Sequence, residues 1–247
     1  MKDNYIGSDG LLYCGVCHEP KQAFWEPGQA SFGTDRHPRP CRCVREQREK
    51  EDRARREQTH RHRVAELRRN CFPYPAMERW TFSNAAQQTK QLEKGRLYAE
   101  NWSTVSKQNA GLLFWGDVGT GKTYLAACIA NALIEQEIPV RMTNLSTVIN
   151  RGFEGREEYI RRLCSCPLLI LDDLGTEMVT EFTKSALYTL INARLLSGRK
   201  TIISTNLTEG ELERLYTPQI CSRLRGEYQD LPFVGRDIRL TRKERGL

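Results

Sequence analysis

Apolar positions are distributed unevenly along the chain, and their spacing changes twice. The first 43 residues have few periodic apolar positions and are rich in Gly, Pro and Cys, whereas charged side chains dominate the stretch that follows. Beyond about residue 76, apolar runs alternate with segments of helical periodicity. The pattern predicts a cysteine-rich module at 1–43, a charged helical linker at 44–75 and a larger α/β domain at 76–247.

Short apolar runs predict the buried strands of the α/β domain. They occur at 111–115, 139–143, 168–171 and 201–205. Segments of helical periodicity, notably 123–137 and 181–197, separate these runs. Alternating strands and helices are typical of a parallel sheet with helices on both faces.

The charged stretch at 44–70 contains ten Lys/Arg and six Asp/Glu but no Gly or Pro, so we expect a helix about 40 Å long. Its large apolar side chains are limited to Val44, Val64 and Leu67, which cannot form a broad buried face. A solvated, salt-bridged linker helix is therefore favoured over a dedicated DNA-binding element. Pro73 and Pro75 are expected to end it.

Composition narrows the class of protein. The net charge of +7 favours a polyanionic partner. No run of 18 apolar residues occurs and the first residues lack the apolar core of a signal peptide, so we expect a cytoplasmic protein without a membrane span. Nine cysteines are an odd number, and in that compartment they should be reduced rather than paired as disulfides.

The segment "GDVGTGKT" matches the phosphate-binding loop G-x-x-x-x-G-K-[ST] and lies between a predicted strand and a predicted helix. We expect it to bind ATP through backbone N–H groups and the start of the helix. Lys122 should reach the β- and γ-phosphates, and Thr123 should hold Mg²⁺. The predicted nucleotide-binding residues are Gly116, Asp117, Val118, Gly119, Thr120, Gly121, Lys122 and Thr123.

Acidic and polar residues follow two later strands. Asp172 and Asp173 end the run "LLILDD", where open α/β sheets bind ligands. We assign Asp172 to Mg²⁺ and Asp173 to the attacking water, with capping of the next turn as the alternative for Asp173. Asn206, after "TIIST", could fix the same water or a phosphate oxygen.

Arginines in "SRLRG" are candidates for a role between subunits. Arg223 or Arg225 could act as an arginine finger on the ATP of a neighbouring chain, and a surface salt bridge is the alternative for either. Further cations could line a groove for nucleic acid or simply be solvated: Lys184, Arg194, Arg199, Lys200 and the arginines at 151–162.

Four cysteines cluster near the N-terminus, as Cys14-x2-Cys17 and Cys41-x-Cys43. Four thiolates can close a tetrahedral, structural zinc site, and a short module with so few apolar residues needs such a staple. His18 or His37 could replace one sulfur, and free thiols in a disordered tail are the alternative. The other five cysteines are expected to be small buried residues.

Four motifs occur in the order found in a known group: "GDVGTGKTYLAACIANAL", "LLILDDLGTE", "TIISTN" and "SRLRG". Over roughly residues 71–247 the chain resembles the AAA+ ATPases of the DnaC-type helicase loaders and the related IstB-type transposition helpers. The resemblance implies catalytic roles for the Walker A lysine Lys122, the Walker B pair Asp172 and Asp173, the sensor 1 residue Asn206 and the arginine finger Arg223.

The same resemblance implies a function and its partners. We expect an ATPase that loads the replicative hexameric helicase onto single-stranded DNA, assembles with itself in the ATP state and grips the helicase with its zinc module. Only 22 residues follow Arg225, so an AAA+ core without a full helical lid is expected, with Arg239 nearest to a sensor-like position.

Rival functions are an IstB-type transposition helper, an ATP-binding adaptor that does not hydrolyse ATP and a small-molecule kinase. The kinase is disfavoured by Asn206 and Arg223.

Overall fold

A computed structural model describes residues 3–26, 33–108, 111–151 and 153–238, with the side chains of 153 and 154 excepted. The chain divides into two compact units, Met1–His62 and Arg63–Leu247. Arg239, the expected sensor-like residue, lies outside the described residues.

Within the part described, no helix has both the length and the apolar character needed to cross a membrane.

The first unit consists of two small antiparallel hairpins followed by the start of a long helix. Strand β1 (Tyr5–Ile6) pairs with β2 (Leu12–Tyr13), and β3 (Gln22–Phe24) pairs with β4 (Arg36–Pro38). The described residues of this unit bury few apolar side chains, namely Leu11, Cys14 and Cys41. Such a module has too small a hydrophobic core to be stable by burial alone.

The helix predicted over 44–70 is present as α1 (Arg42–Cys71), and it ends two residues before Pro73. Most of its side chains are exposed, and ion pairs such as Arg61–Glu57 join successive turns. Its final turns are less exposed, because the side chains of Val64 and Leu67 are buried in the core of the second unit.

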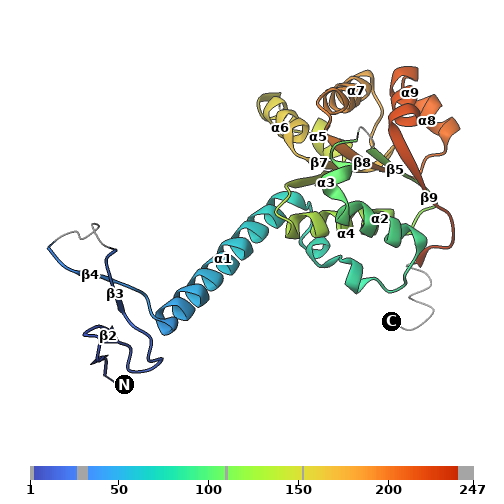
Figure 1. Ribbon diagram of the computed structural model, residues 1–247. Helices are drawn as coiled ribbons and strands as arrows, with labels where there is room; N and C mark the ends of the chain where they lie inside the picture. The colour runs from blue at the N-terminus through green and yellow to red at the C-terminus, as the bar shows by residue number, and fades with distance from the viewer. Residues whose placement is uncertain (1–2, 27–32, 109–110, 152, 239–247) are drawn as a thin grey trace. The chain divides into compact units, whose positions relative to one another are not determined.

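A five-stranded, fully parallel sheet forms the centre of the second unit, in the order β6-β7-β8-β5-β9 (Figure 1). The strands are β5 (Gly111–Gly116), β6 (Val140–Thr143), β7 (Leu168–Leu174), β8 (Lys200–Thr205) and β9 (Tyr228–Phe233). This arrangement confirms the predicted α/β fold class with a parallel sheet.

Strand β9 was not predicted from the sequence. Its residues "YQDLPF" contain exposed polar side chains and Pro232, which the pattern of apolar runs does not recognise as a strand. Among the described residues the strand lies at the edge of the sheet, where it pairs with β5. An edge strand is where a proline is tolerated.

Helices cover both faces of the sheet (Figure 1). They are η1 (Pro75–Arg79), η2 (Phe82–Asn84), α2 (Lys90–Glu100), α3 (Trp102–Val105), α4 (Lys122–Glu135), α5 (Leu145–Ile149), α6 (Phe153–Ser165), α7 (Glu181–Leu196), α8 (Glu209–Leu215) and α9 (Pro218–Glu227). Leu112 and Phe114 of β5 pack in one cluster with α2 and α4, whereas Leu113 packs in another with α5 to α9. The alternation along β5 therefore divides the core into two layers.

Two of the cations proposed for a nucleic-acid groove lie in the interior instead. Arg194 is fully buried, and its guanidinium donates hydrogen bonds to the carbonyls of Leu163, Cys166 and Lys200 and, at 2.9 Å, to the hydroxyl of Thr201. Lys200 is 2% exposed. For these two residues both predicted alternatives, a nucleic-acid groove and a solvated surface position, are wrong because the side chains are buried.

Arg194 joins the end of α7 to the turn before β7 and to the start of β8. We expect Arg194→Met to lower the free energy of unfolding by about 3 kcal/mol, because several buried carbonyl groups lose their donor. Urea unfolding would measure the change. Arg199→Met, at an exposed position nearby, is the matched control and should change stability by less than about 0.5 kcal/mol. Equal stability of the two variants would contradict this role.

Candidate functional site

The phosphate loop connects β5 to α4 in the strand–loop–helix context that its motif requires. Gly116 and Gly121 have φ angles of 131° and 99°, a backbone region that other residues rarely adopt. A Cβ atom at Gly116 would lie 2.2 Å from the carbonyl oxygen of Phe233. These glycines let the loop turn sharply before α4, so the loop has the backbone form that holds a nucleotide phosphate.

Lys122 begins α4 and is only 5% exposed. Its Nζ donates hydrogen bonds of 2.8 Å and 2.7 Å to the carbonyl oxygens of Gly116 and Asp117. The ammonium group is therefore held within its own loop, where its charge adds to the positive end of the α4 dipole.

Asp172 and Thr123, which the sequence assigned to the same Mg²⁺ ion, lie in contact. The Thr123 hydroxyl donates a 3.2 Å hydrogen bond to Oδ1 of Asp172 near the end of β7. Burial raises the pKa of Asp172 to about 6, although a hydrogen bond from the Ser204 hydroxyl opposes this shift. A hydroxyl and a carboxylate oxygen are ligands that Mg²⁺ prefers, so the pair fits that ion.

Asp173 adopts a left-handed backbone conformation, with a φ of 53°. Its N–H donates a 2.8 Å hydrogen bond to Ser204 Oγ, and its carbonyl accepts one of 2.8 Å from the hydroxyl of Thr176. Backbone strain of this kind is frequent at functional sites. In the described part of the chain its carboxylate forms no hydrogen bond, so no capping bond of that side chain is present.

Sequence reasoning missed two residues that support the acidic pair. Ser204 bonds to both aspartates from the neighbouring strand β8, and its only sign in the sequence is a hydroxyl within the apolar run "TIIST". Glu177 is 8% exposed; it accepts a 3.0 Å hydrogen bond from the N–H of Gly175 and another from the hydroxyl of Tyr216. Glu177 thus ties the loop after β7 to the residue that follows α8.

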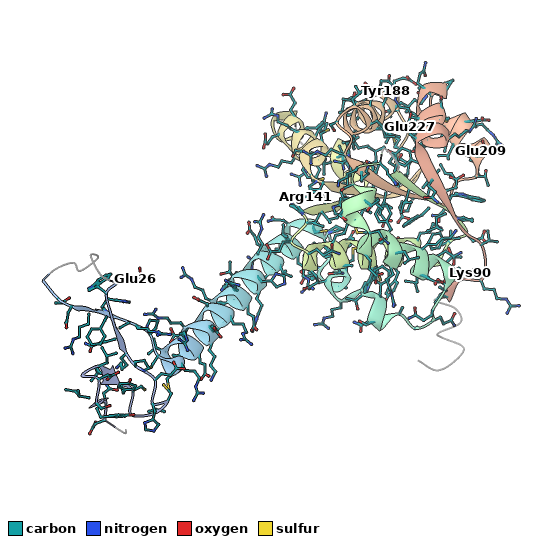
Figure 2. All side chains as sticks on the ribbon, viewed as in Figure 1. Glu26, Lys90, Arg141, Tyr188, Glu209 and Glu227 are labelled. Atoms are coloured by element: carbon teal, nitrogen blue, oxygen red, sulfur yellow. The ribbon has the colours of Figure 1, made fainter. Side chains whose placement is uncertain are left out.

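The two remaining catalytic candidates lie on other elements. Asn206 directly follows β8 and is exposed. Arg223 lies on α9, where its Nε and Nη2 donate to Oδ1 of Asn192 at 3.2 Å and 2.5 Å, and Nη2 also donates to the hydroxyl of Tyr188 at 3.2 Å (Figure 2 labels Tyr188 on α7). Arg225 instead forms ion pairs with Glu209 and Glu213.

The first unit brings four cysteines together. The sulfur atoms of Cys14, Cys17, Cys41 and Cys43 all lie within 4.8 Å of one another. Among the described residues this group contains no histidine. The His18 ring forms a hydrogen bond of 3.1 Å with Tyr5, and the His37 ring packs on Trp25. The arrangement supports the four-cysteine alternative over one that includes a histidine.

Backbone N–H groups stabilise the thiolate form of one cysteine in this cluster. The backbone N–H groups of Cys43 and Glu19 lower the pKa of Cys17 to about 6. The hydrogen bond between Cys43 and the Cys17 sulfur raises the pKa of Cys43 to about 12. Four thiolates can therefore coexist here only with a compensating cation, and four sulfurs at this spacing suit tetrahedral Zn²⁺.

Comparison with known families gives one match that covers most of the chain. The sequence profile of a family described as IstB-like ATP binding protein matches residues 44–222. The matched region contains the phosphate loop, the acidic pair and Asn206, and it leaves the four cysteines outside.

Curated relatives match over shorter regions. The uncharacterized protein YdaV of Escherichia coli (strain K12) is 29% identical over 45% of this chain and 47% of its own length. The replicative helicase loader DnaC of Buchnera aphidicola subsp. Schizaphis graminum (strain Sg) is 26% identical over 66% of each. The chain thus spans about half to two thirds of the length of these relatives.

A crystal structure of DnaI is similar in fold. It superposes with a TM-score of 0.58 at 21% identity, covering 68% of this chain and 94% of that one. At this level of identity the similarity concerns the fold alone, and it agrees with an AAA+ core.

The cysteine cluster leads to a prediction about metal content. We expect purified, reduced protein to hold about one zinc ion per chain, and Cys14→Ser to release it, because three sulfurs cannot complete the tetrahedron. Elemental analysis would measure both. Cys164→Ser, a half-buried cysteine of the other unit, is the control and should retain zinc. Absence of zinc from freshly purified wild-type protein would exclude the metal site.

Proposed function

The chain belongs to the family of IstB-like ATP-binding proteins, and we propose that it is an ATPase that loads a replicative ring helicase onto single-stranded DNA. The observation that carries this proposal is the similarity to proteins named as replicative helicase loaders. The geometry of the nucleotide site supports the ATPase part, since it joins the phosphate loop to a buried carboxylate.

Lys122 and Thr123 would bind the nucleotide, with the loop N–H groups around the phosphates. Lys122 would leave its carbonyl partners in the loop to face the β- and γ-phosphates. Thr123 and Asp172 would hold Mg²⁺, partly through water. The bound ATP–Mg²⁺ supplies the phosphoryl group and neutralises the charge that develops on it.

Asp173 and Asn206 would handle the attacking water. Asp173 directly follows the proposed Mg²⁺ ligand Asp172. Its backbone is fixed by the hydrogen bond that its N–H donates to Ser204 and by the one that its carbonyl accepts from Thr176. We assign the proton-accepting or orienting role to its carboxylate. Asn206 follows the adjacent strand β8, so its amide could hold the same water from the side.

Arg223 would serve a neighbouring subunit. Its Nε and Nη2 are anchored by Asn192 and Tyr188, whereas Nη1 forms no hydrogen bond within the described residues. One edge of the guanidinium is thus fixed and the other is available for phosphate oxygens of the next chain. ATP-dependent self-assembly follows from this role.

The cysteine unit would recognise the helicase. Its four cysteines lie outside the family match, which begins at residue 44. Zinc would fix this small module as a binding arm. For single-stranded DNA we retain Lys184, Arg199 and the arginines at 151–162 as candidate contacts. Among them, Arg151 and Arg156 stack over the rings of Tyr159 and Phe182.

A transposition helper of the IstB type is the second candidate function, because the matching family is described as IstB-like. Both candidate functions require the same ATPase core, so the core does not distinguish a helicase loader from a transposition helper. The cysteine unit favours the loader, since a separate arm suits a dedicated protein partner.

Binding to the helicase tests the proposal. We expect the full chain to co-elute with a replicative hexameric helicase in size exclusion with light scattering, and the complex to be more stable with ATP. Cys14→Ser should weaken this complex while the ATPase core still binds nucleotide. Co-elution with a transposase instead of the helicase would establish the rival function.

Mixed assemblies test Arg223. Arg223→Ala should bind ATP with unchanged affinity, but its turnover with helicase and DNA should fall by about 10³-fold or more. Arg225→Ala, two residues along α9, is the matched control and should keep its turnover. Lys122→Ala loses its own site but still supplies Arg223. A mixture of Lys122→Ala and Arg223→Ala should therefore recover part of the ATPase activity that each variant lacks. Wild-type turnover of Arg223→Ala would identify a surface arginine.

A further inference from the structure

The last residue of β9 and the residues after it, Phe233–Ile238, lie on the phosphate loop, and we call this segment the C-terminal strap. The N–H of Asp117 donates a 2.9 Å hydrogen bond to the carbonyl of Phe233. In return, the N–H of Gly235 donates a 3.0 Å hydrogen bond to Oδ2 of Asp117. The strap is thereby attached to the first half of the loop through both the backbone and the side chain of Asp117.

The end of the strap reaches the middle of the loop. The N–H of Ile238 donates a 3.0 Å hydrogen bond to the carbonyl of Gly119. A Cβ atom built on Gly119 would lie 2.0 Å from both Cγ and Oδ1 of Asp237. The Asp237 carboxylate therefore fills the space beside Gly119, within the loop that the motif assigns to phosphate.

A negative charge at this position has an electrostatic consequence. The loop and the start of α4 attract anions through their N–H groups and through the helix dipole. A carboxylate beside Gly119 would repel a polyphosphate held in the loop. In water, the repulsion between two unit charges about 4 Å apart is about 1 kcal/mol, which corresponds to about a fivefold change in affinity.

We propose that Asp237 sets the nucleotide affinity of this site: its carboxylate opposes the phosphates, and the strap shifts away from Gly119 when they bind. The inference rests on the phosphate-loop part of the proposed function and is independent of the helicase and of DNA. Any partner that draws the strap away from the loop would tighten nucleotide binding.

Calorimetric titration of the full chain with MgADP and MgATP tests the affinity. Asp237→Asn and Asp237→Ala should both bind about fivefold more tightly than wild type, and the gain should shrink as salt is added. Asp230→Asn removes the same charge from an exposed position of β9 and should leave the dissociation constant unchanged. A thermal melt of each variant checks that the fold is retained.

Hydrogen exchange provides a readout of the strap itself. The backbone amides of Gly235 and Ile238 should exchange faster after MgADP is added to the wild-type protein, because their hydrogen bonds to Asp117 and Gly119 of the loop are broken. Slower exchange would overturn the proposed shift, and unchanged or weaker nucleotide binding by Asp237→Asn would overturn the role of its charge.

Lys122→Ala separates this inference from the proposed function. Combined with Asp237→Asn, it should abolish the gain, because the gain depends on phosphates in the loop. Wild-type binding with no gain in Asp237→Asn would overturn the inference alone. Failure of every variant, including wild type, to bind nucleotide would overturn the ATPase proposal as well.

Discussion

The buried carboxylate of Asp172 is the group on which the arrangement of the site depends. A carboxylate removed from water is unfavourable unless hydrogen-bond donors replace the solvent. Here the donors come from two other elements, Thr123 at the start of α4 and Ser204 on β8. One charged group therefore fixes the phosphate-loop helix and two neighbouring strands in register at their carboxyl ends.

Most of this arrangement could be predicted from the sequence because it depends on local patterns. The loop motif requires a strand and a helix at fixed positions, and apolar runs of five or so residues are sufficient to mark the central strands. The pattern of apolar runs did not predict the edge strand β9, because half of its side chains are exposed to solvent. Arg194 was misassigned because the residue type alone does not reveal that its partners are backbone carbonyls distant in the sequence. Lys200 was misassigned because the sequence does not reveal the burial of its side chain. Ser204 was missed for a related reason: a single hydroxyl in a strand acquires a role only through its neighbour in the sheet.

The two units are stabilised by different interactions. The second unit buries apolar side chains on both faces of a sheet. The first unit buries little besides cysteine, and its sulfur atoms crowd together in a way that a divalent cation resolves. Chelators and thiol oxidants should therefore act on the first unit and leave the sheet of the second intact.

The left-handed backbone at Asp173 limits which residues that position can accept in the course of evolution. Asp, Asn and Gly tolerate this conformation best, whereas β-branched residues are excluded by the contact between their Cβ substituents and the backbone. The backbone conformation thus restricts the residue at this position independently of any chemical role of its side chain.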